Sequence, residues 1–157
     1  MADKSNTFVL VSCSKSKQEG TRLARNIYEP SRIFRVRRDY ARANGDHWGI
    51  LSAKYGYLRP WERVPYYQMH ISERSPVWGA FVMAELLEAL EYRDIETVII
   101  LAGSKYVEPL IAPLENAGYT VENPNEGLRP GERYSKLKEQ LQPGVQSTLD
   151  SVSEQTG

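Results

Sequence analysis

The amino-acid sequence predicts a single α/β domain, a three-layer sandwich in which helices cover both faces of a mainly parallel, Rossmann-like or flavodoxin-like sheet. Two observations lead to this fold class. Short apolar runs, typical of strands covered on both faces, alternate with segments of helical periodicity, and such alternation favours parallel strands joined by helices. The length of 157 residues suits one domain that buries a core of its own.

The first strand and the first long helix come from the N-terminal third of the chain. Phe8 to Cys13 is an apolar run that ends in the polar segment Ser14 to Lys17. From Ser31 to Ala43 the sequence predicts an amphipathic helix with an arginine-rich outer face, and Asn44-Gly45 supplies its stop signal. The apolar positions of this helix are Ile33, Val36, Tyr40 and Ala43.

The middle of the chain predicts a strand, a long connection and a helix. Trp48 to Ala53 is a second apolar run, followed by an aromatic and proline-rich connection through Tyr67 that has no helical period. Ser75 and Pro76 are typical of an N-cap and a first helical position, so a helix is expected from there to about Arg93.

The C-terminal third predicts the rest of the sheet. Thr97 to Ala102 is β-branched and uncharged, as expected for a central parallel strand. A helix is expected over Val107 to Asn116, and a short strand begins at Thr120 to Val121. Apolar residues at Tyr134, Leu137 and Leu141 indicate a last helix.

The predicted domain covers residues 8–141. Residues 1–7 are polar and are expected to form a flexible N-terminus. Residues 142–157 contain few apolar side chains, so a disordered tail is expected there.

The cysteine count and the absence of long apolar runs predict a cytoplasmic protein. Cys13 is the single cysteine and cannot form an intramolecular disulfide, which favours a reducing compartment. No apolar run approaches the roughly 20 residues that a bilayer span needs, so no membrane partner is expected. The oligomeric state stays open.

Positive charge is concentrated in one segment although the net charge of the chain is zero. Between Ser14 and Arg42 there are nine basic and three acidic side chains, a local charge of +6. Such a segment can attract phosphates, and Arg32, Arg35 and Arg38 are the residues expected to contact a nucleic-acid backbone. A solvated helix face without a partner is the alternative.

Three loops are expected to form the ligand site. In open parallel sheets, ligands bind outside the carboxyl ends of the strands, where the strand order reverses. The loops are Ser12 to Lys17, Ser52 to Tyr67 and Gly103 to Tyr106, with a later glycine- and proline-rich loop able to close the site. The candidate ligand-binding residues are Ser12, Ser14, Lys15, Lys17, Ser52, Tyr55, Tyr66, Gly103, Tyr106 and Arg129.

The candidate catalytic residues are Cys13, Lys54 and Glu132. Cys13 ends a predicted strand, and the neighbouring lysines favour a thiolate; packing as a small buried hydrophobe is the alternative. Glu132 is either an acid–base group or a first-turn helix carboxylate. One cysteine and two scattered histidines give no metal-ligand spacing, and no glycine-rich nucleotide fingerprint occurs, so neither a metal nor a cofactor is expected.

Several motifs resemble known families. The segments SCSKSK, LSAKYGYLRP and LAGSKYVEPL, with Tyr28 to Ser31 and Asn123 to Gly131, resemble a domain family of unknown function over residues 8 to about 141. LSAKYGYLRP and Pro65-Tyr66 are also similar to the YaaA peroxide-stress proteins, which are associated with DNA binding. A fainter similarity, carried by Cys13, Tyr28 and Ser31, is to the amidinotransfer domain of archaeosine synthase.

The resemblances imply a role that involves nucleobases in nucleic acid, which agrees with the separate charge argument. The leading hypothesis is a metal-independent enzyme that acts on a nucleotide or on a base in nucleic acid, at the glycosidic bond or at an exocyclic group. The alternative is a non-catalytic DNA- or RNA-binding protein with a role in stress or defence. The substrate and the reaction stay open.

Overall fold

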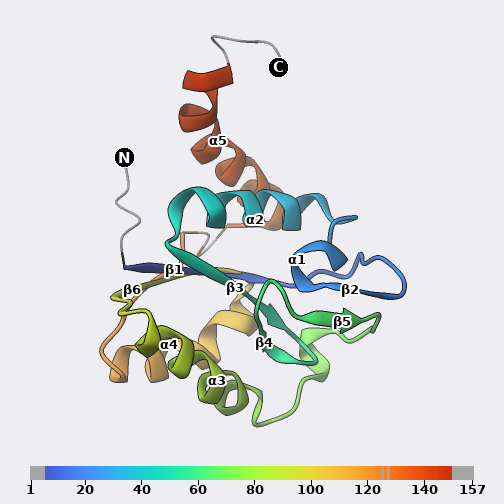
Figure 1. Ribbon diagram of the computed structural model, residues 1–157, viewed down its shortest axis with the longest axis vertical. Coiled ribbons are helices and arrows are strands. Elements are labelled where there is room, and N and C mark those ends of the chain that lie inside the picture. The colour runs from blue at the N-terminus through green and yellow to red at the C-terminus, as the bar shows by residue number, and fades with distance from the viewer. Residues whose placement is uncertain (1–5, 125, 127, 150–157) are drawn as a thin grey trace.

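A five-stranded, mostly parallel sheet forms the centre of the protein (Figure 1). The computed structural model describes residues 6–124, 126 and 128–149, with backbone only at 130 and 141–149. The strand order is β4-β3-β1-β6-β7; β3, β1, β6 and β7 run parallel, and β4 is antiparallel to β3. The strands are β1 (Thr7–Ser12), β3 (His47–Ser52), β4 (Gly56–Leu58), β6 (Thr97–Leu101) and β7 (Thr120–Glu122). The predicted α/β class and the mainly parallel sheet are confirmed.

Helices flank this sheet. Helix α2 (Arg32–Asn44) packs on β1 and β3, and α5 (Pro130–Leu149) packs against α2. Helices α3 (Trp78–Tyr92) and α4 (Ser104–Asn116) lie on the other side of the sheet, where α3 contacts β4 and α4 contacts β7 (Figure 1). All six residues of β1 are buried, as the apolar run at that position predicts.

The strand order reverses between β1 and β6. From β1 the chain passes through α2 to β3 on one side, whereas the later strands β6 and β7 add to the other side. Val11 pairs with Leu101, so the residues after these two strands emerge next to each other. This edge is where ligands bind in sheets of this topology.

Several short elements were not expected from the sequence. They are β2 (Thr21–Leu23), α1 (Ala24–Ile27), β5 (Arg63–Pro65) and the 3-10 helix η1 (Ile71–Glu73), in addition to β4. Strands β2 and β5 form a separate antiparallel pair. The connection through Tyr67, which was predicted to be irregular, contains the two strands β4 and β5. Each has three residues, which is too short to show alternation in the sequence.

The buried face of α2 differs from the predicted stripe. The buried residues are Phe34, Val36, Arg37 and Ala41, whereas Ile33 and Tyr40 are half-buried and Ala43 is exposed. The buried face of α2 is therefore rotated about the helix axis relative to the predicted apolar stripe. Arg37, one of the arginines between the predicted apolar positions, points inward and donates a hydrogen bond to Ser12 Oγ.

Two helix starts also differ from the predicted ones. Helix α3 begins at Trp78, because Ser75 and Pro76 form the preceding turn, in which Ser75 Oγ accepts from the Val77 amide. Helix α4 begins at Ser104, directly after its N-cap Gly103.

Helix α5 continues to Leu149 and passes the expected end of the domain at residue 141. The few apolar side chains of residues 142–149 predict that this segment has no buried face, but they do not prevent its backbone from being helical. The expected flexible N-terminus and tail fall in part on residues 1–5 and 150–157, which lie outside the described residues. In the described part of the chain, no helix has the length and apolarity that a membrane span requires.

Candidate functional site

A pocket of about 710 Å³ lies at the sheet edge where the strand order reverses. The residues that follow β1 form one wall, Tyr106 in the first turn of α4 forms another, and the segment around η1 forms the third. We call it the Cys13 pocket; its lining residues are Cys13, Ser14, Lys15, Lys17, Gln68, Met69, His70, Ile71, Glu73 and Tyr106.

Cys13 and Tyr106 contact each other in this pocket. The Cys13 Sγ lies 3.2 Å from the Tyr106 hydroxyl oxygen. The Tyr106 ring packs edge-on against Trp78, at 5.9 Å between ring centroids. Burial, and secondarily the nearby Cys13 sulfur, raise the pKa of Tyr106 well above its ordinary value, so the phenol stays protonated at neutral pH.

A chain of buried hydroxyl groups lies beside Cys13. The Tyr28 and Tyr67 hydroxyl oxygens are 2.7 Å apart, and the Tyr67 hydroxyl is 2.9 Å from Ser52 Oγ. Burial raises the pKa of both tyrosines, and the proximity of Cys13 adds to the effect. We call Cys13, Tyr28, Ser52, Tyr67 and Tyr106 the thiol–phenol cluster.

Lys17 is a basic residue that lies beside this cluster. Its Nζ lies 4.6 Å from the centre of the Tyr67 ring and 3.2 Å from the Lys15 carbonyl oxygen. Burial lowers the pKa of Lys17, against a smaller opposite effect of Cys13. Lys17 is therefore a better proton donor than an ordinary exposed lysine.

His70 and Glu73 complete the far wall of the pocket. His70 Nδ1 accepts from the Ser72 amide, and Glu73 Oε1 accepts from the His70 amide at 2.9 Å, which caps η1. These two residues and Tyr67 are not among the candidate site residues predicted from the sequence, because their contacts depend on how the long connection packs. Among the described residues, no group of three or more His, Cys, Asp or Glu side chains has a geometry that could hold a metal ion.

Arg37 approaches the same sheet edge from the α2 side. The side chain is 7% exposed, and its Nη1 donates to Ser12 Oγ at 2.7 Å. Burial and, to a smaller extent, the positive charge of Arg133 lower the pKa of Arg37 to about 10. The Arg37 Nε has no hydrogen-bond partner.

The structure brings together several of the residues predicted to form the site. Ser14, Lys15, Lys17 and Tyr106 line the Cys13 pocket. Gly103 is the N-cap of α4 at the same sheet edge. The parallel strands β1 and β6 account for this placement, as expected.

Ser12 and Ser52 reach this edge but are directed into the protein. They are 2% and 0% exposed, and both are engaged by protein groups. Ser52 Oγ also accepts from the amides of Lys54 and Tyr55. These two serines therefore position other side chains and do not face the pocket.

The other predicted residues lie outside the Cys13 pocket. Tyr55 packs edge-on against Tyr67 at 5.2 Å, and the exposed Lys54 places its Nζ 5.4 Å from the centre of the Tyr55 ring. Tyr66 is 42% exposed and accepts from Gln68.

Arg129, just before α5, forms an ion pair with Glu132 in the first turn of that helix. Glu132 Oε1 accepts from the Arg129 amide at 2.9 Å, and its Oε2 lies 3.4 Å from Arg129 Nη2. Neither residue lines the Cys13 pocket. Of the two roles considered for Glu132, the contacts match the helix-start carboxylate.

The three arginines predicted to contact a nucleic-acid backbone are not equivalent. Arg32 and Arg35 are exposed, and Arg32 stacks on Tyr134. Arg38 has a side chain only 11% exposed and forms an ion pair with Glu29 at 3.0 Å. Arg38 is therefore already engaged within the protein.

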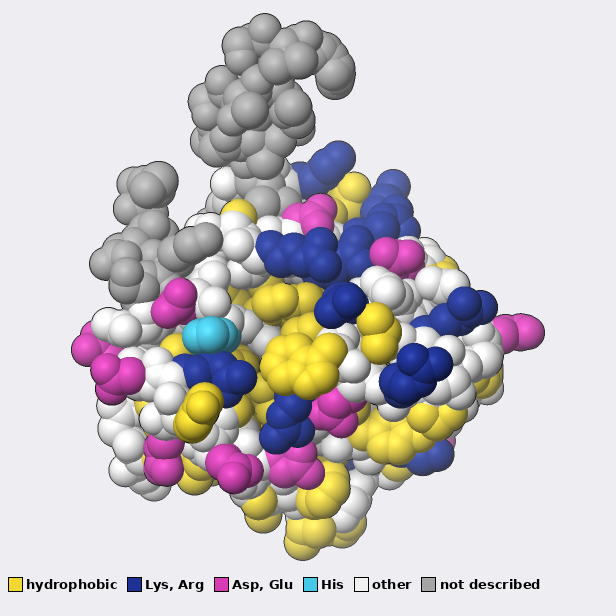
Figure 2. All heavy atoms as spheres, viewed as in Figure 1, with side chains coloured by type: hydrophobic (Ala, Val, Ile, Leu, Met, Phe, Trp, Pro, Cys, Tyr) yellow, Lys and Arg dark blue, Asp and Glu magenta, His cyan; other side chains and the backbone are white. Residues whose placement is uncertain are grey.

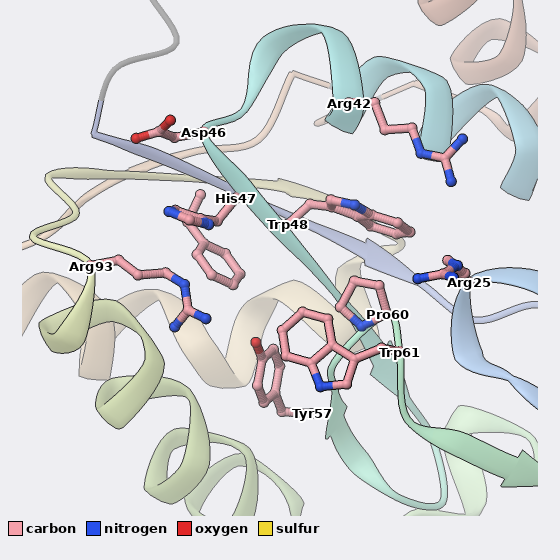
Figure 3. Close-up of a pocket in the computed structure, with 10 residues that line it drawn as sticks. Arg25, Arg42, Asp46, His47, Trp48, Tyr57, Pro60, Trp61 and Arg93 are labelled. Carbon is pink, nitrogen blue, oxygen red and sulfur yellow. The ribbon is translucent and has the colours of Figure 1, made fainter.

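A second hollow, which the sequence does not predict, lies beside β3 and β4. It encloses about 260 Å³ and combines Trp48, Tyr57 and Trp61 with Arg25, Arg42 and Arg93 (Figure 3). On this face of the molecule, hydrophobic side chains gather at the centre with basic side chains around them (Figure 2). We call the three aromatic residues and three arginines of this hollow the Trp–Arg surface; they are Trp48, Tyr57, Trp61, Arg25, Arg42 and Arg93.

The comparisons with known proteins identify a family whose function is unknown. A model of a family of unknown function (DUF6884) matches residues 8–139, which run from β1 into α5. No curated protein and no solved structure matches the chain. The expected resemblance to a family of unknown function is confirmed, whereas these matches include neither the YaaA proteins nor archaeosine synthase. The chain belongs to the family of unknown function DUF6884.

Proposed function

We propose that this protein is an enzyme that acts on a nucleotide, or on a base within nucleic acid, in the Cys13 pocket. The observation that carries the proposal is the contact of the Cys13 thiol with the Tyr106 phenol inside a pocket at the point where the strand order reverses. A volume of about 710 Å³ is in the range of small-molecule sites. Lys15 and Lys17 supply the positive charge that a phosphorylated ligand needs.

The architecture supports this reading. The parallel strand order β3-β1-β6-β7, with α2 on one side of the sheet and α3 and α4 on the other, supports a flavodoxin-like three-layer sandwich as part of this proposal (Figure 1). A free cysteine as the reacting group also favours a reducing compartment, the cytoplasm.

The chemistry we propose is a displacement at carbon. The neutral amine of Lys17 accepts the proton of the Cys13 thiol, and the sulfur bonds to a carbon of the sugar or base as the bond to the leaving group breaks. The Lys17 ammonium then returns that proton to the leaving group. The oxygen of a water molecule next bonds to the same carbon as the carbon–sulfur bond breaks, and one proton of that water passes to the sulfur, which restores the thiol. Tyr106, which stays protonated, orients the sulfur.

Product formation tests this proposal. The protein is incubated separately with each ribo- and deoxyribonucleoside monophosphate and with short single-stranded DNA and RNA, and the mixtures are analysed by liquid chromatography and mass spectrometry. We expect a released base or an altered nucleotide with at least one substrate, no turnover by Cys13→Ser, and unchanged turnover by Ser16→Ala in the same loop. The absence of product with every substrate, or equal turnover by Cys13→Ser, contradicts the proposal.

A second candidate function is non-catalytic nucleic-acid binding, and the Trp–Arg surface favours it. The exposed ring of Trp61 and the half-buried ring of Trp48 lie among arginines, which provides stacking for bases and charge for phosphates, the combination found in single-strand binders. This function requires binding that depends on Trp61 and Arg42 and yields no product, so the two candidates give different results in the same assays.

A further inference from the structure

We propose that Arg37, Arg133 and the N-terminus of α4 form a binding site for a phosphate group at the sheet edge next to the Cys13 pocket. The inference deepens the proposed function, on which it rests for the identity of the whole ligand: the phosphate would belong to the nucleotide whose base or sugar lies in the pocket.

The first observation is a buried positive charge without a counter-ion. Arg37 is 7% exposed, and within the described residues no carboxylate lies at ion-pairing distance from Arg37 or Arg133. One hydroxyl, Ser12 Oγ, accepts from Arg37 Nη1, and the buried Nε has no acceptor. An uncompensated buried charge is costly, so the arrangement is incomplete without an anion.

The second observation is that another guanidinium group faces the same place. Arg133 projects from α5, and its positive charge contributes, after burial, to the lowered pKa of Arg37. A Cβ placed on Gly103 would lie 3.7 Å from Arg133 Nη1, so the guanidinium is directly in front of the Gly103 backbone. The two guanidinium groups repel each other, and an anion between or beside them would offset that repulsion.

The third observation is the start of α4. Gly103 is its N-cap and has no side chain to accept from the first amides, and the first helical hydrogen bonds run from Tyr106 and Val107 to the Gly103 carbonyl. The amides of Ser104 and Lys105 precede these bonds and add to the positive end of the helix dipole. Val11 pairs with Leu101, which places Ser12 beside this helix start.

Phosphate fits these donor groups better than a carboxylate does. Arg133 Nε already donates to the Leu128 carbonyl oxygen and Arg37 Nη1 to Ser12 Oγ, but the other guanidinium N–H groups and two backbone amides still provide more donors than a carboxylate can accept. Ser12 and Cys13 are consecutive, with Ser12 directed to Arg37 and Cys13 to Tyr106. One ligand can therefore place its phosphate on the Arg37 side and its reacting carbon on the Cys13 side.

Thermal unfolding of the full chain with inorganic phosphate tests the inference. Chloride is replaced by phosphate in the millimolar range at constant ionic strength and pH, and the apparent Kd is taken from the rise in Tm. We expect a saturable rise for the wild-type chain and at least about ten-fold weaker binding for Arg133→Gln, because a charge-assisted contact is lost. Lys138→Ala, which removes an exposed charge from the same helix, should bind phosphate as the wild type does.

Arg37→Met provides an independent readout. Removing a buried charge that lacks a counter-ion should raise Tm in the absence of phosphate and abolish the response to phosphate. If Arg37→Met does not fold, the comparison of Arg133→Gln with Lys138→Ala decides alone.

Three results would overturn the inference: no saturable response of the wild type, an equal response of Arg133→Gln, or a lower Tm of Arg37→Met together with a retained response. The nucleotide proposal can fail separately, because a phosphate site that depends on Arg133 would then be found without any turnover of nucleotides.

Discussion

The Cys13 sulfur lies 3.2 Å from the hydroxyl oxygen of Tyr106, a residue 93 positions later in the chain. Adjacent parallel strands produce this contact, since Cys13 follows β1 and Tyr106 lies in the first turn of the helix that follows β6. The contact matters because it directs the single thiol of the chain to a pocket. The cluster around it has consequences for stability, for pH dependence and for binding.

Ser52→Ala should destabilise the fold by about 1–3 kcal/mol, because the hydroxyl is fully buried and its loss leaves the amides of Lys54 and Tyr55 without an acceptor. Urea unfolding measures the change. Ser16→Ala, in an exposed loop, should change stability by less than about 0.5 kcal/mol. Equal effects of the two substitutions would mean that the Ser52 hydrogen bonds do not support the fold.

Stability should fall as the pH rises above 10. The pKa values of Tyr28, Tyr67 and Tyr106 are raised in the folded state, so above pH 10 the unfolded chain releases phenol protons that the folded chain retains. The stabilising effect is complete below pH 10 and is lost as the pH approaches the folded-state values, by up to about 1.4 kcal/mol per pH unit for each tyrosine.

Tyr106→Phe should reduce this loss of stability at high pH. The comparison is Tyr92→Phe, because Tyr92 is 86% exposed and lies outside the thiol–phenol cluster. Denaturant unfolding between pH 8 and pH 11 gives the slopes. If the free energy of unfolding of Tyr106→Phe falls with pH as steeply as that of the wild type, the Tyr106 phenol ionises alike in the folded and unfolded states.

Replacing arginines of α2 should separate stability from nucleic-acid affinity. Arg38→Ala breaks the ion pair with Glu29 and a hydrogen bond to the Arg25 carbonyl oxygen, and should cost about 1 kcal/mol of stability. The double substitution Arg32→Ala with Arg35→Ala should leave stability nearly unchanged but lower oligonucleotide affinity and the dependence of that affinity on salt. The opposite assignment of the two effects would refute this division.

Trp61→Ala should weaken binding of single-stranded DNA by about ten-fold if the Trp–Arg surface binds bases, because stacking of one base contributes about 1–3 kcal/mol. Trp61 is 55% exposed, so the fold should tolerate its loss. Phe81→Ala, which removes a similarly exposed aromatic side chain on α3, is the control, and fluorescence anisotropy is the measurement. Unchanged affinity of Trp61→Ala would eliminate the second candidate function at this surface.

The sequence predicts the main strands well because their apolar runs are long enough to be read directly. β1, β3 and β6 lie within one residue of the expected runs, and the reversal of strand order locates the site once those strands are parallel. The three-residue strands β2, β4 and β5 could not be predicted, because their pairing depends on contacts between distant segments.

Parts of the site could not be predicted for a different reason. Helical periodicity treats Arg37 as an outward residue, and only the packing of α2 on β1 brings its guanidinium to Ser12. The same holds for Tyr67, whose hydroxyl meets Tyr28 and Ser52 across loops that no local pattern connects.

Alkylation of Cys13 by iodoacetamide tests the central claim most directly, since the chain has no other cysteine and Cys13 lines the proposed nucleotide pocket. The rate is followed by intact-protein mass spectrometry with and without each nucleoside monophosphate and each short oligonucleotide, and glutathione alkylated in parallel controls for reagent loss. A nucleotide in the pocket should slow alkylation of Cys13 at least about ten-fold, with saturation, and should not affect glutathione. Alkylation at the same rate with every nucleotide and oligonucleotide would contradict the assignment of the Cys13 pocket as a nucleotide site.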